Sequence, residues 1–410
     1  MRSRNPLKYV LLYLSLVLIA TLLNGCWDRR EIEERALVLG IGIDTAKPAE
    51  TQSNKDQSTL LGNAPLTSTG LLHVTVQIAV PGRIPLGPGE GGTGGGGGTK
   101  TVWVLDAEGH TVEDALNNIQ QKVAHPLFFG HLRVIVLSEA IAKKGVDNIN
   151  EYFRRNPEVR RMNWMFVCKN RAEDIMRVSP ELERVPTIYL LNIMDESLRM
   201  GKFPNDFIGL FWSASSSKGQ EGILPYIELS PGSTINLSGL AYFRSEHLVG
   251  TTNSLEITLF MGIRGIHQAG AQAYVKIPQT SEYIMFGTKY RNSHIKVIMV
   301  NGKPEIRVKI ALEGNILEKS TDKFTLNDDL IKKFEQQLKE DAQKSYEELI
   351  KKTQQKQSDI FGFGEYVRAK EPAYWDREIK TKEAWQKEYQ NLSVQMEVKV
   401  HIRRVGMKSQ

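Results

Sequence analysis

Stretches in which apolar residues alternate with polar ones, or run unbroken for about five residues, predict the β-strands of this 410-residue chain. In the first half, such stretches cover residues 37–43, 71–80, 101–105, 133–137 and 164–168. In the second half, residues 240–243 form another, and residues 295–299 and 306–312 flank Asn301-Gly302. An Asn-Gly pair supplies the positive φ angles of a tight turn, so the last two stretches predict a hairpin. Residues 394–402 alternate strictly, and we expect them to complete the sheet of the hairpin.

Apolar residues at helical spacing predict helices between these strands. Thr111 is a typical N-cap, and the apolar residues that follow it share one face: Val112, Ala115, Leu116, Ile119 and Val123. Further helices are expected at residues 146–153, 187–199, 253–260 and 328–352. The last of these carries a dense mixture of Lys and Glu, which indicates a solvent-exposed face. Strands and helices in this order predict an α+β fold, with mixed β-sheets covered by helices.

The length of the chain predicts more than one domain. The stretch from residue 26 to residue 410 is too long for one small core. Residues 45–70 are polar and residues 87–98 are nearly all glycine, so both are expected to be mobile loops of an N-terminal domain over residues 26–205. The loop-like composition of residues 206–232 predicts a linker. A C-terminal domain would follow over residues 233–405, with a possible subdivision near residue 275.

The first residues predict export from the cytosol. Arg2, Arg4 and Lys8 precede an uncharged apolar run over residues 9–23. A membrane-spanning helix needs about 20 apolar residues, so this shorter run fits the apolar region of a signal peptide over residues 1–25. Leu23-Asn24-Gly25-Cys26 resembles the lipobox of bacterial lipoproteins, which implies cleavage before Cys26 and lipid on its thiol. An uncleaved, tilted membrane anchor is the alternative, and both place the remaining chain outside the cytosol.

Composition and charge narrow the classes of function. Hydrophobic residues at 41% and charged residues at 24% are typical of a folded chain that is neither disordered nor a multi-span membrane protein. Removal of Arg2, Arg4 and Lys8 lowers the net charge from +6 to +3, which is too weak to indicate nucleic acid binding. Beside Cys26 the chain has one cysteine, Cys168, whose apolar neighbours predict a small buried side chain rather than a nucleophile.

The sequence contains no pattern that predicts catalysis, a cofactor or a metal. The glycines of residues 87–98 include a GxGxxG match, but no strand leads into it and no helix follows it, as dinucleotide binding requires. The histidines lack the spacing of a metal site: His73, His110, His125 and His131. GxSxG and HExxH motifs are absent. Trp375 and Trp385 flank a charged helical stretch, and we expect them to pack in the core.

Four distinctive blocks of residues occur in order along the chain. The first is Cys26-Trp27-Asp28-Arg29-Arg30-Glu31-Ile32-Glu33, followed by Gly40-Ile41-Gly42-Ile43-Asp44. The second is Phe129-Gly130-His131 with Val134-Ile135 and Glu139. The third is Gly239-Leu240-Ala241 with Leu248-Val249-Gly250, and the fourth is Asp359-Ile360-Phe361-Gly362 with Trp375. Together these blocks resemble the Ger(x)C family of spore germination lipoproteins, the C subunits of nutrient germinant receptors. The resemblance covers residues 26–405, and the glycine-rich insert over residues 87–98 departs from it.

The resemblance implies a lipid-anchored subunit at the outer face of the spore inner membrane, required for nutrient-triggered germination. It implies membrane-embedded A and B subunits as partners, a fold of three αβ domains, no catalysis and no cofactor. A solute-binding lipoprotein of an importer is the alternative, which would need two similar lobes around a cleft.

The segment directly after the lipid is the candidate docking site for the partner subunits. It consists of Trp27, Asp28, Arg29, Arg30 and Glu31. Because Cys26 would hold this segment at the lipid headgroups, its interfacial tryptophan and mixed charges could meet the membrane-embedded subunits. A solvated leader that only tethers the folded domains is the alternative interpretation.

Overall fold

The computed structural model describes residues 34–47, 70–80, 101–178, 183, 185–266, 270–276, 282–321 and 326–404, with residues 7, 10, 11 and 13–15 near the amino terminus. The predicted lipidation site Cys26, the docking segment over residues 27–31 and most of the predicted loops 45–70 and 87–98 lie outside these residues. Within the described part of the chain, no helix is long and apolar enough to cross a membrane.

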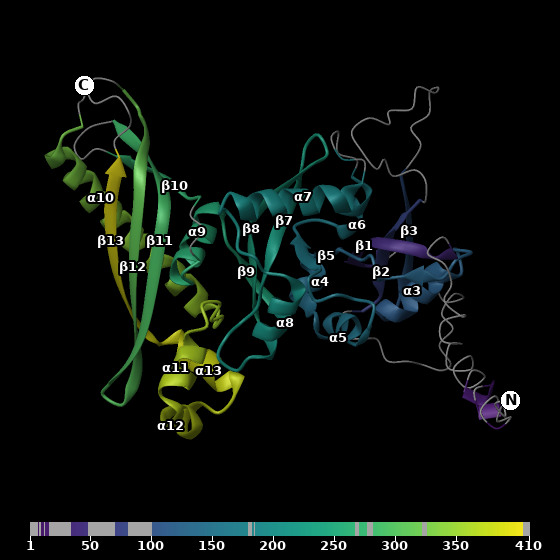
Figure 1. The fold of residues 1–410 in the computed structure, drawn as a ribbon. Helices are drawn as coiled ribbons and strands as arrows, with labels where there is room; N and C mark the ends of the chain where they lie inside the picture. Colours follow the sequence, from purple (N-terminus) through teal and green to yellow (C-terminus); the bar gives the residue numbers. More distant parts are fainter. Residues whose placement is uncertain are drawn as a thin grey trace, which may run out of the picture.

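A nine-stranded mixed sheet forms the larger half of the fold (Figure 1). Its strand order is β3-β2-β1-β5-β6-β7-β8-β9, and β4 pairs with β1. Strands β1, β5, β6 and β7 are parallel neighbours, and antiparallel strands extend the sheet on both sides. The strands are β1 (Ala36–Thr45), β2 (Leu72–Ala79), β3 (Val102–Gly109), β4 (Leu127–Phe128), β5 (Val134–Ser138), β6 (Trp164–Cys168), β7 (Ile223–Ser230), β8 (Thr234–Arg244) and β9 (His247–Thr251).

Helices cover both faces of this sheet, with α7 above it and α5 and α8 below it in the view of Figure 1. One face packs against α3 (Val112–Gln120), α4 (Glu139–Lys144), α5 (Asp147–Arg155) and α8 (Ile208–Ser216). The other packs against α6 (Ala172–Arg177), α7 (Pro186–Arg199) and α9 (Ser254–Ile263). Successive residues of β5 therefore enter different cores: Val134 and Val136 one, Ile135 and Leu137 the other. Burial on both faces explains why β5 and β6 are unbroken apolar runs.

A four-stranded sheet follows, in the order β10 (Gln272–Lys276), β11 (Tyr283–Val300), β12 (Lys303–Lys319) and β13 (Ser393–Arg404). Asn301 and Gly302 have φ angles of 51° and 78°, which confirms the predicted hairpin turn between β11 and β12. Strand β13 pairs with β12 in parallel, so it completes the sheet as expected.

A parallel pair needs a long connection, and the helices between β12 and β13 supply it. They are α10 (Asp328–Gln355), α11 (Phe363–Lys370), α12 (Pro372–Tyr374), the π-helical turn η3 (Trp375–Ile379) and α13 (Lys382–Gln390). The apolar stripe of α10, with Phe334 and Leu349 fully buried, packs on the sheet. The core beneath α6 and α7 continues into this region, so the two halves share buried residues.

The structure confirms an α+β fold of mixed sheets covered by helices, and it corrects the linker predicted over residues 206–232. That stretch holds helix α8 and strand β7, and β7 lies inside the large sheet between β6 and β8. Its apolar residues Ile223, Leu224 and Ile227 are buried in the two cores, whereas the serines that suggested a loop end helix α8. The strands on either side of the predicted linker therefore belong to one sheet.

Candidate functional site: two buried aspartates and an ion-pair cluster

Asp44, at the end of β1, caps helix α6 across 128 residues of sequence. Its side chain is 1% exposed, and Oδ1 and Oδ2 accept hydrogen bonds of 2.9 Å from the backbone N–H groups of Ala172 and Glu173. Helix α6 has no side-chain cap of its own, because Arg171 stands at its N-cap position. Asp44 therefore satisfies two backbone N–H donors that have no partner within the helix and places a negative charge at its positive end.

Two glycines of β1 let α6 and α7 approach the strand closely. A Cβ on Gly42 would lie 2.9 Å from Met176 Cγ, and one on Gly40 would lie 2.7 Å from Thr187 Oγ1. Either Cβ would force a neighbouring atom to shift, and one on Gly42 would also lie 3.2 Å from the Ala172 backbone, so the glycines allow α6 to pack closely on β1 beside Asp44. Gln77, on the neighbouring β2, adds a 3.1 Å hydrogen bond to the Met176 carbonyl.

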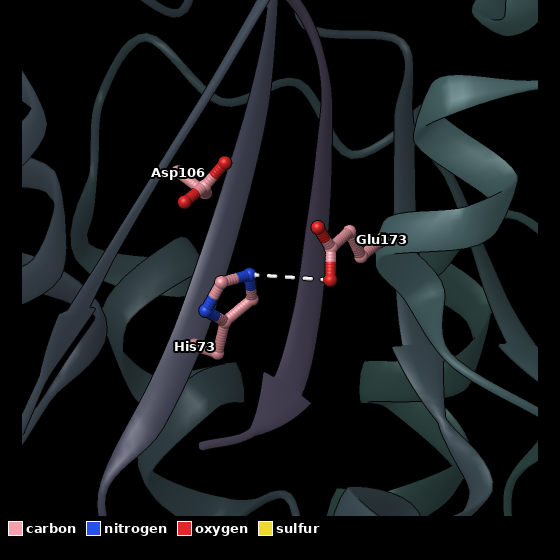
Figure 2. A group of neighbouring side chains, drawn as sticks. All are labelled: His73, Asp106 and Glu173. Atoms are coloured by element: carbon pink, nitrogen blue, oxygen red, sulfur yellow. Dashed lines mark ion pairs between the residues drawn. The ribbon is translucent and has the colours of Figure 1, made fainter. Parts of the chain in front are cut away.

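An ion-pair cluster lies beside this cap, between β2, β3 and α6. His73 is buried, and its Nδ1 lies 3.1 Å from Glu108 Oε1. Figure 2 shows the opposite ring nitrogen, Nε2, facing the Glu173 carboxylate, with 3.6 Å between Nε2 and Oε2. Arg177 binds both Asp106 and Glu173. The cluster thus joins two strands of the sheet to helix α6 through paired charges.

The cluster brings together residue types that could hold a metal ion. Ligand atoms of His73, Asp106 and Glu173 lie within 4.8 Å of one another. Both carboxylates are already bound by arginine: Arg177 contacts each of them, and Arg171 lies 3.1 Å from Glu173. Burial opposes ionisation of Glu173, yet His73 and the two arginines outweigh it and hold the pKa of this carboxyl below its usual value. The arrangement therefore fits a structural ion-pair network better than a metal centre.

A second buried aspartate, Asp359, gathers backbone donors at the start of α11. Oδ1 accepts from the N–H groups of Gly362 at 2.9 Å and Phe363 at 3.2 Å. Oδ2 accepts from the N–H of Gly364 and from Trp385 Nε1, both at 2.9 Å. Burial raises the pKa of Asp359 to about 6, although these hydrogen bonds act in the opposite direction. This carboxyl ties helix α13 to the loop before α11.

Comparison with known proteins identifies the family. The family model "Spore germination protein N-terminal domain" matches residues 28–229, and the model "Spore germination B3/GerAC like, C-terminal" matches residues 238–406. The chain belongs to the Ger(x)C family. It is 25% identical to Spore germination protein KC of Bacillus subtilis (strain 168), over 99% of this chain and 97% of that protein. It is 24% identical to Spore germination protein GerQC of Bacillus cereus, over 76% of this chain and 85% of that protein.

The fold also resembles a solved Ger(x)C structure. The crystal structure of the GerBC protein aligns with a TM-score of 0.56 and 17% identity, over 84% of this chain and 98% of that chain. At this identity the likeness concerns the fold alone. The two family models meet between residues 229 and 238, at the turn between β7 and β8, so one sheet contains strands from both matched regions.

The other Ger(x)C blocks also have structural roles. In the second block, Phe129 is buried, and its N–H donates to Glu158 Oε2 at 2.8 Å. In the third, Leu240 N–H donates to Thr252 Oγ1 at 2.8 Å, and a Cβ on Gly239 would overlap the Thr252 carbonyl. The family blocks thus hold separate segments of the chain in contact.

The remaining candidate side chains are buried in the Ger(x)C cores. Cys168 is 1% exposed, and burial raises the pKa of its thiol well above the usual value, which confirms a small buried residue. Trp375 and Trp385 are nearly fully buried, with ring centroids 5.5 Å apart, which confirms their packing in the core. The sequence did not predict the cluster around His73, because its members come from separate elements with no local spacing signal.

Proposed function

We propose that this Ger(x)C protein is the lipid-anchored C subunit of a germinant receptor, required for nutrient-triggered spore germination. The observation that carries the proposal is the order of features: a lipobox at residues 23–26, followed by two germination family models that together span residues 28–406. The lipid on Cys26 would hold the folded halves at the outer face of the spore inner membrane, beside the A and B subunits.

We also propose that the protein acts through protein contacts rather than catalysis. Asp44 and Asp359 use their carboxylates to bind backbone N–H groups, and the cluster around His73 pairs its charges internally. Buried groups whose hydrogen bonds are used in this way support the fold. The unlike architecture of the halves, one sheet of nine strands and one of four, argues against the two similar lobes of a solute-binding lipoprotein.

The docking segment over residues 27–31 is proposed to contact the A and B subunits. Replacement of Arg29 and Arg30 by Glu should weaken co-purification of the two partners and slow nutrient-triggered germination. Germination by agents that bypass the receptor should be unchanged, because the folded halves remain intact. If spores with this variant germinate at the wild-type rate and the complex stays intact, the segment serves only as a tether.

Lipid attachment can be tested directly. Cys26→Ala should abolish palmitate labelling, release the protein from the spore membrane and block the response to nutrient. Cys168→Ala is the matched control, since it removes the chain's other cysteine from a buried site and should leave labelling unchanged. Normal palmitate labelling of Cys26→Ala would overturn the anchor, and a normal nutrient response without any C subunit in the membrane would overturn the receptor role.

A further inference from the structure

We propose that the amino-terminal edge of the large sheet docks on an anionic membrane surface, an inference that rests on the proposed lipid anchor. Four arginines define this basic edge: Arg35, Arg133, Arg160 and Arg161. Because β1, β5 and β6 are parallel, their first residues lie at one edge of the sheet. Arg35 and Arg133 directly precede β1 and β5, and Arg160 and Arg161 lie in the turn that leads into β6 at Trp164.

Backbone hydrogen bonds join the entry of β5 to the first half of β1 and to the entry of β6. The N–H of Arg133 donates to the Leu39 carbonyl at 3.0 Å, and the carbonyl of Arg133 accepts from Trp164 N–H at 2.9 Å. Arg35 is placed by its guanidinium, which lies 4.5 Å from the centre of the Phe128 ring. The positive groups are therefore carried by the residues before β1 and β5 and by the turn before β6.

The two edges of the sheet differ in how their charges are paired. At the carboxyl-terminal edge, Lys143 pairs with Glu139, Lys169 with Glu228 and Arg171 with Glu173. Among the described residues, no carboxylate lies within 4.0 Å of any arginine of the basic edge. In the part of the chain that the structure describes, the acidic residues nearby in sequence are Glu34 and Glu158, and Glu158 accepts a backbone N–H. The basic edge thus presents a net positive surface to solvent.

Exposed apolar side chains lie beside the arginines. Met162 follows Arg161 and is 68% exposed, and Leu210 is 50% exposed on helix α8. A 2.9 Å hydrogen bond from Gly209 N–H to the Arg161 carbonyl brings the start of α8 to this edge. Basic residues around exposed apolar side chains are the composition that binds the interface of anionic bilayers.

The position of the anchor selects a membrane as the occupant of this edge. Nine residues separate Cys26 from the first residue of β1, and an extended chain spans at most ~3.6 Å per residue. The basic edge therefore lies within about 36 Å of the lipid, on the side of the sheet where the chain enters. The corresponding upper bound for the paired edge is longer by the length of β1.

A labelling experiment tests the orientation. Residues 27–410, with Cys168→Ala and a histidine tag in place of Cys26, are tethered to vesicles that contain a nickel-chelating lipid, so the test does not depend on lipidation of Cys26. A fluorophore is placed by Met162→Cys, before β6, or by Asn170→Cys, after β6. Headgroup-linked quencher should quench position 162 more strongly than position 170 on phosphatidylglycerol vesicles. Equal quenching of positions 162 and 170 on phosphatidylglycerol vesicles would overturn the proposal. The same would follow if position 162 were quenched as strongly on phosphatidylcholine vesicles as on phosphatidylglycerol vesicles.

Charge removal tests the same edge without a tether. Because each basic residue strengthens binding to an anionic surface about fivefold, Arg133→Ala, Arg160→Ala and Arg161→Ala together should weaken binding to phosphatidylglycerol vesicles about a hundredfold. Lys143→Ala, Lys144→Ala and Lys169→Ala change the net charge equally at the other edge and should have much less effect. Equal losses in the two variants would contradict a specific basic edge. Unchanged lipid binding with lost co-purification of the A and B subunits would assign the edge to a protein partner.

Discussion

Asp44 and Asp359 perform the same task in the two halves of the molecule with different electrostatic support. Each is 1% exposed and accepts backbone N–H groups at the start of a helix. Asp44 has a cation nearby, with Arg171 at 3.9 Å, whereas Asp359 relies on three N–H groups and the Trp385 indole. Burial raises the pKa of both carboxyls, and that of Asp359 reaches about 6.

The comparison shows why the family blocks identify a fold without indicating a reaction. In the first block, Asp44 stands beside Gly40 and Gly42, which admit the helices; in the fourth, Asp359 stands before Gly362, whose φ is 75°. An aspartate that binds backbone donors and a glycine that permits close approach depend on each other. Such pairs hold separate segments of the chain in contact and so stabilise the fold.

Asp359→Ala should have the largest effect on stability. It leaves four buried donors without their acceptor, and at pH 5 the free energy of unfolding should fall by about 4 kcal/mol. Urea unfolding followed by tryptophan fluorescence reports the change, because Trp385 is one of the donors. Asp376→Ala, at an exposed position of η3, is the control and should change stability by less than about 0.5 kcal/mol. A loss below about 1 kcal/mol for Asp359→Ala would show that the loop rearranges.

The pH dependence of stability provides the second test of Asp359. The folded state binds this proton more tightly than the unfolded chain, whose carboxyl has the usual pKa near 3.8, so stability falls as pH rises from 3.8 to about 6. Asp359→Asn should remove up to about 3 kcal/mol of this decline. Burial also raises the pKa of Asp206, to about 7. Asp206 therefore contributes a further fall in stability with rising pH, which is the same in wild type and variant. If the free energy of unfolding of wild type and of Asp359→Asn changed with pH in parallel, the raised pKa of Asp359 would be contradicted.

Local signals in the sequence predicted the regular elements but not the contacts between them. The Thr111 cap and the Asn301-Gly302 turn act within a few residues, and both are found as expected. Strand β7 lies in the stretch whose loop-like composition and serine run predict a linker, and its Pro225, a residue rare in central strands, further weakens the strand signal. Asp44 caps α6, which lies 128 residues away in sequence. The sequence block around Asp44 therefore pointed to the family but could not predict this contact.

Asp44→Ala should have an intermediate effect, confined to one part of the sheet. Two buried N–H groups of α6 lose their acceptor, so local stability should fall by about 2–3 kcal/mol. Hydrogen exchange of the peptide that covers residues 172–177 should accelerate, whereas exchange in α11 should not. Asp174→Ala removes an exposed acidic residue from the first turn of the same helix and should cost less than about 1 kcal/mol. Equal acceleration in both variants would mean that charge near the helix, rather than the cap, stabilises α6.

Arg171→Gln should have the smallest effect, and it removes the main difference between the two aspartates. The guanidinium lowers the pKa of Asp44 and also binds Glu173, so its loss should destabilise the fold by about 1 kcal/mol at pH 7. The deficit should shrink as pH falls towards 4, because protonated carboxyls no longer need a cation. Arg155→Gln, which breaks an exposed pair with Glu151, is the control and should cost less than about 0.5 kcal/mol at either pH. A deficit for Arg171→Gln that stays constant with pH would indicate lost packing, and Asp44 would then be held, like Asp359, by neutral hydrogen-bond donors without help from a cation.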